Sequence, residues 1–177
     1  MVKETYRASD IIGGIRDQIK KTPPRRDFLD LNEAIEDVIA LVRGELVKNR
    51  VSVHTRLADE LPPVRGDRVQ LQQVMLNLIL NAIEAMGGVD DEARHLIVST
   101  ESNRTEGLLV GVSDSGPGIA SEDRERIFGS FYTTKAGGVG IGLSICRSII
   151  DAHGGRLWAD ANQPRGAVFK FTLPVHN

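Results

Sequence analysis

Glycine is distributed unevenly along this chain, and its distribution limits the possible folds. Nine of the 18 glycines fall between Gly107 and Gly142, in about a fifth of the 177 residues. Glycine is required where the backbone takes a positive φ angle, turns sharply or approaches another group closely. We therefore expect the second half of the chain to contain a glycine-rich loop that moves or contacts a ligand through its backbone.

The rest of the composition is typical of a globular domain. The chain has 41% hydrophobic and 26% charged residues and a formal net charge of -2, which excludes disorder and argues against nucleic-acid binding driven by charge. The single cysteine, Cys146, excludes an internal disulfide and a cysteine-based zinc cluster. Since no apolar run is long enough to span a membrane, we expect a cytoplasmic location, which leaves open a membrane anchor elsewhere in a longer parent protein.

Apolar periodicity predicts an α+β fold, with helices on one face of a mostly antiparallel sheet. The expected helices cover residues 4–21, about 32–48, 67–86 and 141–153, with a short one at 121–128. The expected strands cover residues 28–30, 51–55, 96–101, 108–113, 156–161 and 167–173. Two consecutive prolines follow the first helix and interrupt the chain there. We therefore expect a helical segment at 1–26 and a domain at 27–177.

The predicted helix at 67–86 carries a polar stripe of amides and one carboxylate. Its members are three or four residues apart and share one face of the helix: Gln70, Gln73, Asn77, Asn81 and Glu84. A solvated face would explain the stripe, although Lys and Glu are better helix formers at such positions than Asn. Amide and carboxylate oxygens suit Mg²⁺, which keeps several waters and takes only one or two protein ligands.

A carboxylate and two glycines follow the predicted strand at 108–113, in the order Asp114, Gly116 and Gly118. Asp114 can accept a hydrogen bond from the exocyclic amine of adenine, where guanine would present an acceptor and be rejected. The glycines allow a base or sugar to approach the backbone closely. Taken alone, the stretch is also a common turn signature.

A second group of glycines, at 137–142, directly precedes a predicted helix. Backbone N–H groups at such a helix start attract phosphate. Leu143 stands where a P-loop needs its lysine, which argues against a P-loop NTPase, and the glycine spacing does not match a dinucleotide fingerprint. The residues between the two glycine groups, 120–136, are expected to close over a triphosphate as a lid, with an ordinary surface loop as the alternative.

Four stretches of the chain, in this order, resemble the motif boxes of one family. They are the N box at 77–85, the G1 box at 114–119, the F box at 127–135 and the G2 box at 138–143. With them, the chain resembles the ATP-binding catalytic domain of two-component sensor histidine kinases, within the superfamily that includes gyrase B, Hsp90 and MutL. The F box is most similar to those of the nitrogen-regulation and oxygen-sensing sensor kinases.

The resemblance implies a Bergerat-type fold, a two-layer sandwich in which a mixed, mostly antiparallel five-stranded sheet packs on three helices. It implies ATP and Mg²⁺ as ligands, with Asn81 holding the metal and Asp114 reading adenine. Asn77 is implied to contact the nucleotide and serve catalysis, together with Lys135 or Arg126 as a cation on the γ-phosphate. The other implied nucleotide-binding residues are Glu84, Gly116, Gly118, Ile119, Phe128, Thr133, Thr134, Gly138, Gly140, Gly142 and Leu143.

The implied reaction is transfer of the ATP γ-phosphoryl group to a histidine, for relay to an aspartate of a response regulator. Asn77 occupies the place where hydrolytic superfamily members carry a glutamate, and an amide cannot act as a general base. No histidine of this chain is followed by Glu, as the phosphoacceptor motif requires: His54, His95, His153 and His176. We therefore expect the phosphoacceptor outside this chain, and ATP binding without self-phosphorylation. His153 is instead expected at a helix C-terminus, where its charge suits the helix dipole.

The expected partners follow from the same resemblance. They are the dimerisation and phosphoacceptor domain of the same kinase and a cognate response regulator. Residues 1–26 resemble the C-terminal part of the second helix of that dimerisation domain, followed by a linker. A homodimer is expected for the full-length protein, while the chain alone can be a monomer because its first helix offers only a small apolar surface. The alternative function is a nucleotide-dependent protein-binding module of the anti-sigma-factor kinase or MutL type.

Overall fold

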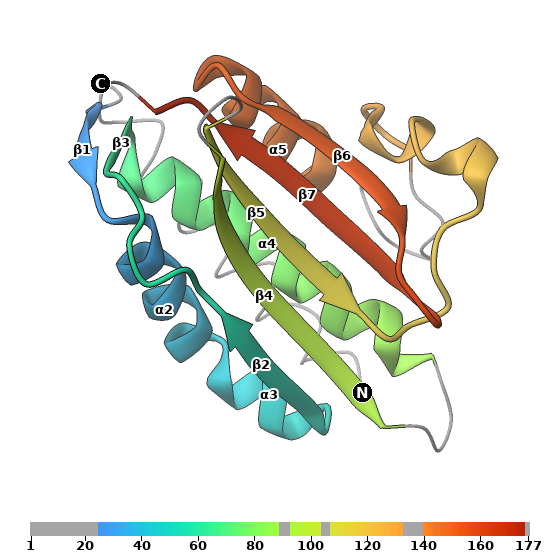
Figure 1. The fold of residues 1–177 in the computed structure, drawn as a ribbon. Coiled ribbons are helices and arrows are strands. Elements are labelled where there is room, and N and C mark those ends of the chain that lie inside the picture. Colours follow the sequence, from blue (N-terminus) through green and yellow to red (C-terminus); the bar gives the residue numbers. More distant parts are fainter. Residues whose placement is uncertain (1–24, 89–92, 104–106, 133–139, 176–177) are drawn as a thin grey trace.

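The computed structural model describes residues 25–88, 93–103, 107–132 and 140–175. These residues form a five-stranded sheet and a layer of helices that covers one of its faces (Figure 1). The predicted α+β two-layer sandwich is thereby confirmed. The helix expected at 4–21 lies outside the described residues, so the division of the chain near residue 26 remains a prediction.

The large sheet is mixed because one of its edge strands runs parallel to its neighbour. Its strand order is β2 (Val51–Arg56), β4 (Arg94–Asn103), β5 (Gly107–Asp114), β7 (Ala167–Leu173) and β6 (Arg156–Ala161). β2 and β4 pair in parallel, whereas the other three pairs are antiparallel. On β4 and β5, Leu96, Val98, Val110 and Val112 alternate with more exposed residues and form the core beneath the helices. The predicted five-stranded, mostly antiparallel sheet is confirmed.

The central helix is α4 (Arg68–Gly87), which packs against α2, α5 and β5. Asp67 caps its N-terminus by accepting a hydrogen bond from the Gln70 amide at 3.0 Å, as the sequence predicts. Asp30 caps α2 (Leu31–Leu41) in the same way through the Glu33 amide. The last helix, α5 (Gly142–Ala152), lies beside α4 (Figure 1).

Three details differ from the expectation. The single helix predicted to reach Lys48 is divided at Val42 into α2 and α3 (Arg43–Lys48), although helical hydrogen bonds continue on both sides of Val42. The short helix predicted at 121–128 is a pair of 3₁₀ turns, η1 (Ser121–Asp123) and η2 (Arg126–Phe128). The short strand β1 (Asp27–Leu29) pairs with β3 (Val64–Gly66), an element that the sequence did not predict. No helix in the described part of the chain is both long and apolar enough to cross a membrane.

Candidate functional site

The polar stripe of α4 becomes more exposed toward the C-terminus of the helix. Asn77 is only 7% exposed, Asn81 is half-buried and Glu84 is exposed. The interpretation as a solvated face is therefore wrong for the first part of the stripe, because Gln73 is buried as well as Asn77. The part between Asn81 and Glu84 is accessible to a ligand.

Asn77 is tied to α5 by an unusual contact. Its Nδ2 donates a hydrogen bond to Sγ of Cys146 at 3.5 Å, and Cys146 is fully buried. Burial raises the pKa of the Cys146 thiol to about 12, so the thiol stays protonated at neutral pH. The pair positions one amide of the stripe between two helices and supplies no general base.

Asp114 is the last residue of β5 and is only 3% exposed. Its Oδ1 accepts hydrogen bonds from the backbone amides of Gly116 at 2.8 Å and Ala167 at 3.3 Å. Burial raises the pKa of Asp114, and the two amide donors act in the opposite direction. Within the part of the chain that the structure describes, no group donates to Oδ2. The site thus holds a buried carboxylate with one oxygen left to accept a hydrogen bond from a ligand.

Residues 114–119, which we name the Asp114 loop, pass against the C-terminal end of α4. A Cβ atom at Gly116 would lie 3.3 Å from the backbone of Ala85 and 2.9 Å from Oδ1 of Asp114. Gly118 has a φ of +83°, a conformation that other residues rarely adopt. Because these glycines allow the close approach, the Asp114 carboxylate and the accessible end of the α4 stripe lie on the same side of the domain. Ile119, at the end of the loop, packs against the core.

The segment after the Asp114 loop is held by its aromatic residues. Phe128 is 5% exposed, and its ring makes an edge-to-face contact with Phe169 at 6.2 Å. Arg126 lies over the ring of Tyr132 at 5.3 Å and forms an ion pair with Asp123. The structure thus gives Phe128 an anchoring position in the core, and Arg126 is exposed with its charge toward solvent and Asp123. Their roles toward a nucleotide stay predictions.

A backbone hydrogen bond connects Phe131, within the predicted lid, to Gly140, which follows the lid. The Phe131 amide donates to the Gly140 carbonyl at 2.9 Å, and both residues have a φ of 69°. A Cβ atom at Gly140 would lie 2.7 Å from backbone atoms of Phe131 and Tyr132. The predicted site residues between them lie outside the described residues and stay predictions: Thr133, Thr134, Lys135 and Gly138.

Helix α5 begins at Gly142, the last residue of the second glycine group. In the described residues no side chain caps this helix start, and a Cβ atom at Gly142 would meet open space. Leu143, the next residue, packs against the core. Within the described residues, no capping side chain therefore competes for the first backbone N–H groups of α5, and their binding of an anionic ligand stays a prediction.

Sequence reasoning did not assign any part of the site to the turn between β6 and β7. Asn162 Nδ2 donates to the Asp114 carbonyl at 2.8 Å, and Arg165 Nε donates to the Gly116 carbonyl at 3.1 Å. Gly166, with a φ of +106°, is the one local signal of a close approach in this turn. The contact itself joins segments about 50 residues apart, which no local pattern encodes.

His153 is at the C-terminal end of α5, as expected, but its predicted role as a charge is wrong. Its Nε2 accepts a hydrogen bond from the Asp67 amide at 3.0 Å, and its Nδ1 lies 2.7 Å from the Ile149 carbonyl. An imidazole that accepts at Nε2 and donates at Nδ1 is neutral. His153 therefore connects the end of α5 to the start of α4 by hydrogen bonds.

The donor set fits a magnesium ion better than a transition metal. In the described ranges, no three or more His, Cys, Asp or Glu side chains form a group that could hold a metal ion. Mg²⁺ does not need such a group, because it binds one or two protein oxygens together with phosphate oxygens and water. The amide of Asn81, on the accessible part of the α4 stripe, is a ligand of this kind.

Comparison with known proteins agrees with this geometry. Residues 66–177 match the model of the histidine kinase-, DNA gyrase B- and HSP90-like ATPase family. The chain belongs to this family. The solved catalytic domain of the histidine kinase ThkA is 39% identical, with a TM-score of 0.75 over 84% of this chain and 95% of that chain. The chain therefore contains the ATP-binding catalytic domain of the sensor histidine kinases.

Two similar curated proteins are much longer than this chain. The sensor histidine kinase TmoS of Ectopseudomonas mendocina is 38% identical over 99% of this chain but 18% of its own length. The sensor protein FixL of Bradyrhizobium diazoefficiens is 39% identical over 98% of this chain and 34% of its own length. These relatives favour the sensor-kinase interpretation over the anti-sigma-factor or MutL alternative. Because the chain spans 18% of the length of TmoS and 34% of the length of FixL, the activity of the whole protein is a matter for proposal.

Proposed function

We propose that this domain binds Mg²⁺-ATP between the accessible end of α4, the Asp114 loop and the start of α5. The observation that carries the proposal is the Asp114 carboxylate, which is buried, holds two backbone amides on Oδ1 and has Oδ2 left to accept. An acceptor in this position pairs with the exocyclic amine of adenine and is mismatched with the carbonyl of guanine. Adenine nucleotides are therefore the expected ligands.

The α4 stripe would hold the metal. We assign Asn81 as the protein ligand of Mg²⁺, with Asn77 and Glu84 beside it on the same helix face. When bound, the ion neutralises the charge of the phosphate oxygens. The N-terminus of α5, with its uncapped N–H groups, would receive the phosphates. Lys135 and Arg126 remain the proposed cations for the γ-phosphate.

The proposed reaction is phosphoryl transfer to a histidine on another segment, and not hydrolysis of ATP. Asn77 cannot remove a proton from water, and its neighbour Cys146 is kept protonated by burial. A neutral imidazole can attack the γ-phosphorus directly. The nitrogen–phosphorus bond forms as the bond from the γ-phosphorus to the bridging oxygen breaks, ADP leaves, and the imidazole loses its proton to solvent.

A face of α5 beside Gln70, in the first turn of α4, is the proposed docking site of the phosphoacceptor domain. A groove of about 460 Å³ lies there, lined by Phe131, Ile141, Ile145 and Ile149 among others. Phe131 is 76% exposed, although a large apolar side chain loses free energy in water. A helical hairpin that carries the histidine and covers this groove would bring its imidazole to the phosphate end of the site.

A response regulator and homodimer formation complete the proposal. The histidine kinase ThkA has been solved in complex with the response regulator TrrA, and this chain is 34% identical to that kinase with a TM-score of 0.78. The similarity extends over 99% of this chain and 49% of the other. By analogy we propose that the full-length parent is a dimeric kinase that passes its phosphoryl group to an aspartate of a cognate response regulator.

A transfer assay tests the function. The chain is mixed with ATP labelled at the γ-phosphate, Mg²⁺ and a separate dimerisation hairpin of the parent kinase that bears the histidine. We expect an acid-labile, base-stable label on the hairpin, none on the chain itself, and none on a hairpin with His replaced by Gln. Asn81→Ala should lose the label and the Mg²⁺ dependence of ATP binding. Nucleotide binding without transfer would contradict the kinase function.

A further inference from the structure

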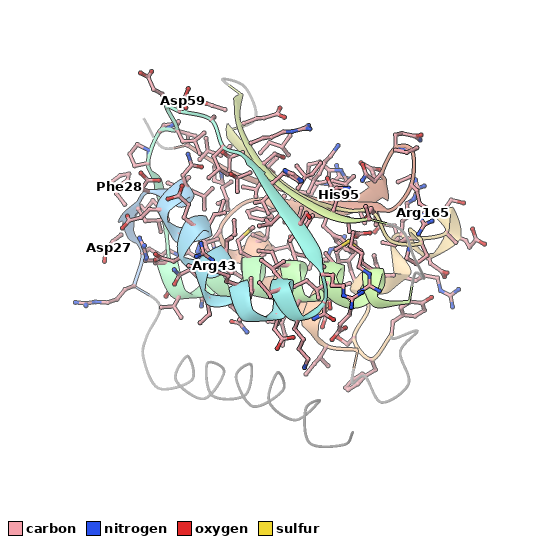
Figure 2. The ribbon with its side chains drawn as sticks, turned by 90° about the horizontal axis from the view of Figure 1, so that it is seen from below. Asp27, Phe28, Arg43, Asp59, His95 and Arg165 are labelled. Atoms are coloured by element: carbon pink, nitrogen blue, oxygen red, sulfur yellow. The ribbon has the colours of Figure 1, made fainter. Side chains whose placement is uncertain are left out.

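The turn between β6 and β7, residues 162–166, lies directly against the Asp114 loop. We name it the β6–β7 turn. Asn162 Nδ2 donates to the Asp114 carbonyl at 2.8 Å, and Arg165 Nε donates to the Gly116 carbonyl at 3.1 Å. Just after the turn, the Ala167 amide reaches Oδ1 of Asp114 at 3.3 Å. Figure 2 labels Arg165 where the turn and the loop adjoin.

The two segments pack backbone to backbone. A Cβ atom at Gly166 would lie 1.9 Å from the Asp114 carbonyl oxygen, and one at Gly118 would lie 3.0 Å from the Gly166 carbonyl oxygen. The turn is closed by its own hydrogen bond, from the Asn162 amide to the Gly166 carbonyl at 2.9 Å. At Gly166 the two backbones therefore meet with no side chain between them, while Asn162 and Arg165 contact the loop on either side of that point.

The Asp114 loop needs such support because it has little of its own. The carbonyls of Asp114, the last residue of β5, and of Gly116, just beyond it, accept from the Asn162 and Arg165 side chains, and buried carbonyls require donors. Gly116 and Gly118 give the loop wide conformational freedom. The Ala167 amide also donates to Oδ1 of Asp114. The direction in which Oδ2 points therefore depends on residues 162–167, about 50 positions later in the sequence.

We propose that Asn162 and Arg165 are positioning residues for base recognition, which hold the Asp114 loop so that Oδ2 faces the amine of adenine. This inference rests on the proposed function. Neither side chain is assigned a contact with the nucleotide. They act by donating to the carbonyls of Asp114 and Gly116. Their loss should therefore lower the preference for adenine over guanine more than it lowers the stability of the fold.

The chain offers atom-level variants with matched controls. Asn162→Asp keeps the oxygen that accepts from the Gln163 amide at 3.0 Å but places an acceptor where the donor to Asp114 was. Gln163→Glu adds the same charge one residue along, on an exposed side chain. Arg165→Ala removes the donor to Gly116, and Arg156→Ala removes an exposed arginine from the same hairpin, where it lies over Trp158.

Calorimetric titration with ATP and with GTP, in the presence of Mg²⁺, measures the effect. We expect Asn162→Asp and Arg165→Ala each to weaken ATP binding about three- to tenfold, the equivalent of one hydrogen bond, and to lower the ATP-to-GTP affinity ratio. Arg165→Lys should restore part of the ratio, and the two control variants should stay within about twofold of the unaltered chain.

Thermal unfolding separates positioning from structural support. An unchanged ATP-to-GTP ratio in Arg165→Ala, or equal losses for both nucleotides accompanied by a lower Tm, would overturn the inference and leave the proposed function standing. An unaltered chain that binds no ATP would overturn the proposed function and this inference together.

Discussion

Replacing Asp114 by Asn should lower the affinity for ATP and raise the free energy of unfolding of the ligand-free protein. The amide oxygen of Asn can still accept from the Gly116 and Ala167 amides, as Oδ1 does now. The second atom changes from an acceptor to an NH₂ donor, which faces the donor amine of adenine. A hydrogen bond to a charged group contributes about 1.5–3 kcal/mol. ATP affinity should therefore fall by about 10- to 150-fold.

Without nucleotide, the same variant should be more stable than the unaltered chain. Burial raises the pKa of Asp114 in the folded state above that in the unfolded chain. The free energy of unfolding of the unaltered chain thus decreases as the pH rises through this pKa, because the folded state holds the proton more tightly than the unfolded state. Asn has no proton to lose, so the advantage of the variant should grow with pH and become constant above the pKa of folded Asp114.

Two measurements check these expectations. Calorimetry gives the affinities for ATP and GTP, and urea unfolding at several pH values between about 4.5 and 8 gives the difference in free energy of unfolding. A variant that keeps the ATP preference would refute the role of Oδ2 in base recognition. A variant that is less stable than the unaltered chain at neutral pH would refute the argument that the ionised carboxylate is held against a desolvation penalty.

Two further predictions concern the backbone and the helix connection. Gly140→Ala should lower the free energy of unfolding by about 1–3 kcal/mol in a urea titration, because φ is positive and the new Cβ would lie 2.7 Å from neighbouring backbone. Gly142→Ala is the control and should leave the free energy of unfolding unchanged, because its Cβ would lie in open space. His153→Ala should lower the free energy of unfolding by about 1–3 kcal/mol, because the part-buried Asp67 amide loses its acceptor. Unchanged amide hydrogen exchange at Asp67 in this variant would contradict the contact.

The sequence predicted those elements whose signals are local. The capping residue Asp67 and the apolar periodicity of 67–86 determine α4, and alternation determines β4 and β5. β3 was missed because its three residues include one large apolar side chain, Val64, whereas the equally short β1 has two, Phe28 and Leu29. The interruption at Val42 was missed because the apolar pattern continues through it.

The site was predictable in its chemistry but not in its support. Asp114 and the glycines around it are recognisable from residue type and spacing; the structure buries Asp114, and its role in base recognition stays a prediction. The hydrogen bonds from Asn162 and Arg165, and the link from His153 to Asp67, connect residues far apart in sequence. Such contacts depend on how strands and helices pack, and a single sequence does not encode them in any local pattern.

The β6–β7 turn also sets the order in which this protein becomes functional during synthesis. Three hydrogen bonds of the Asp114 loop come from residues 162–167, so its full set of hydrogen bonds forms only after the last hairpin of the sheet has left the ribosome and docked. Nucleotide cannot stabilise the nascent chain before that moment. Until then, the growing domain depends on its apolar core and on the hydrogen bonds of the elements already made.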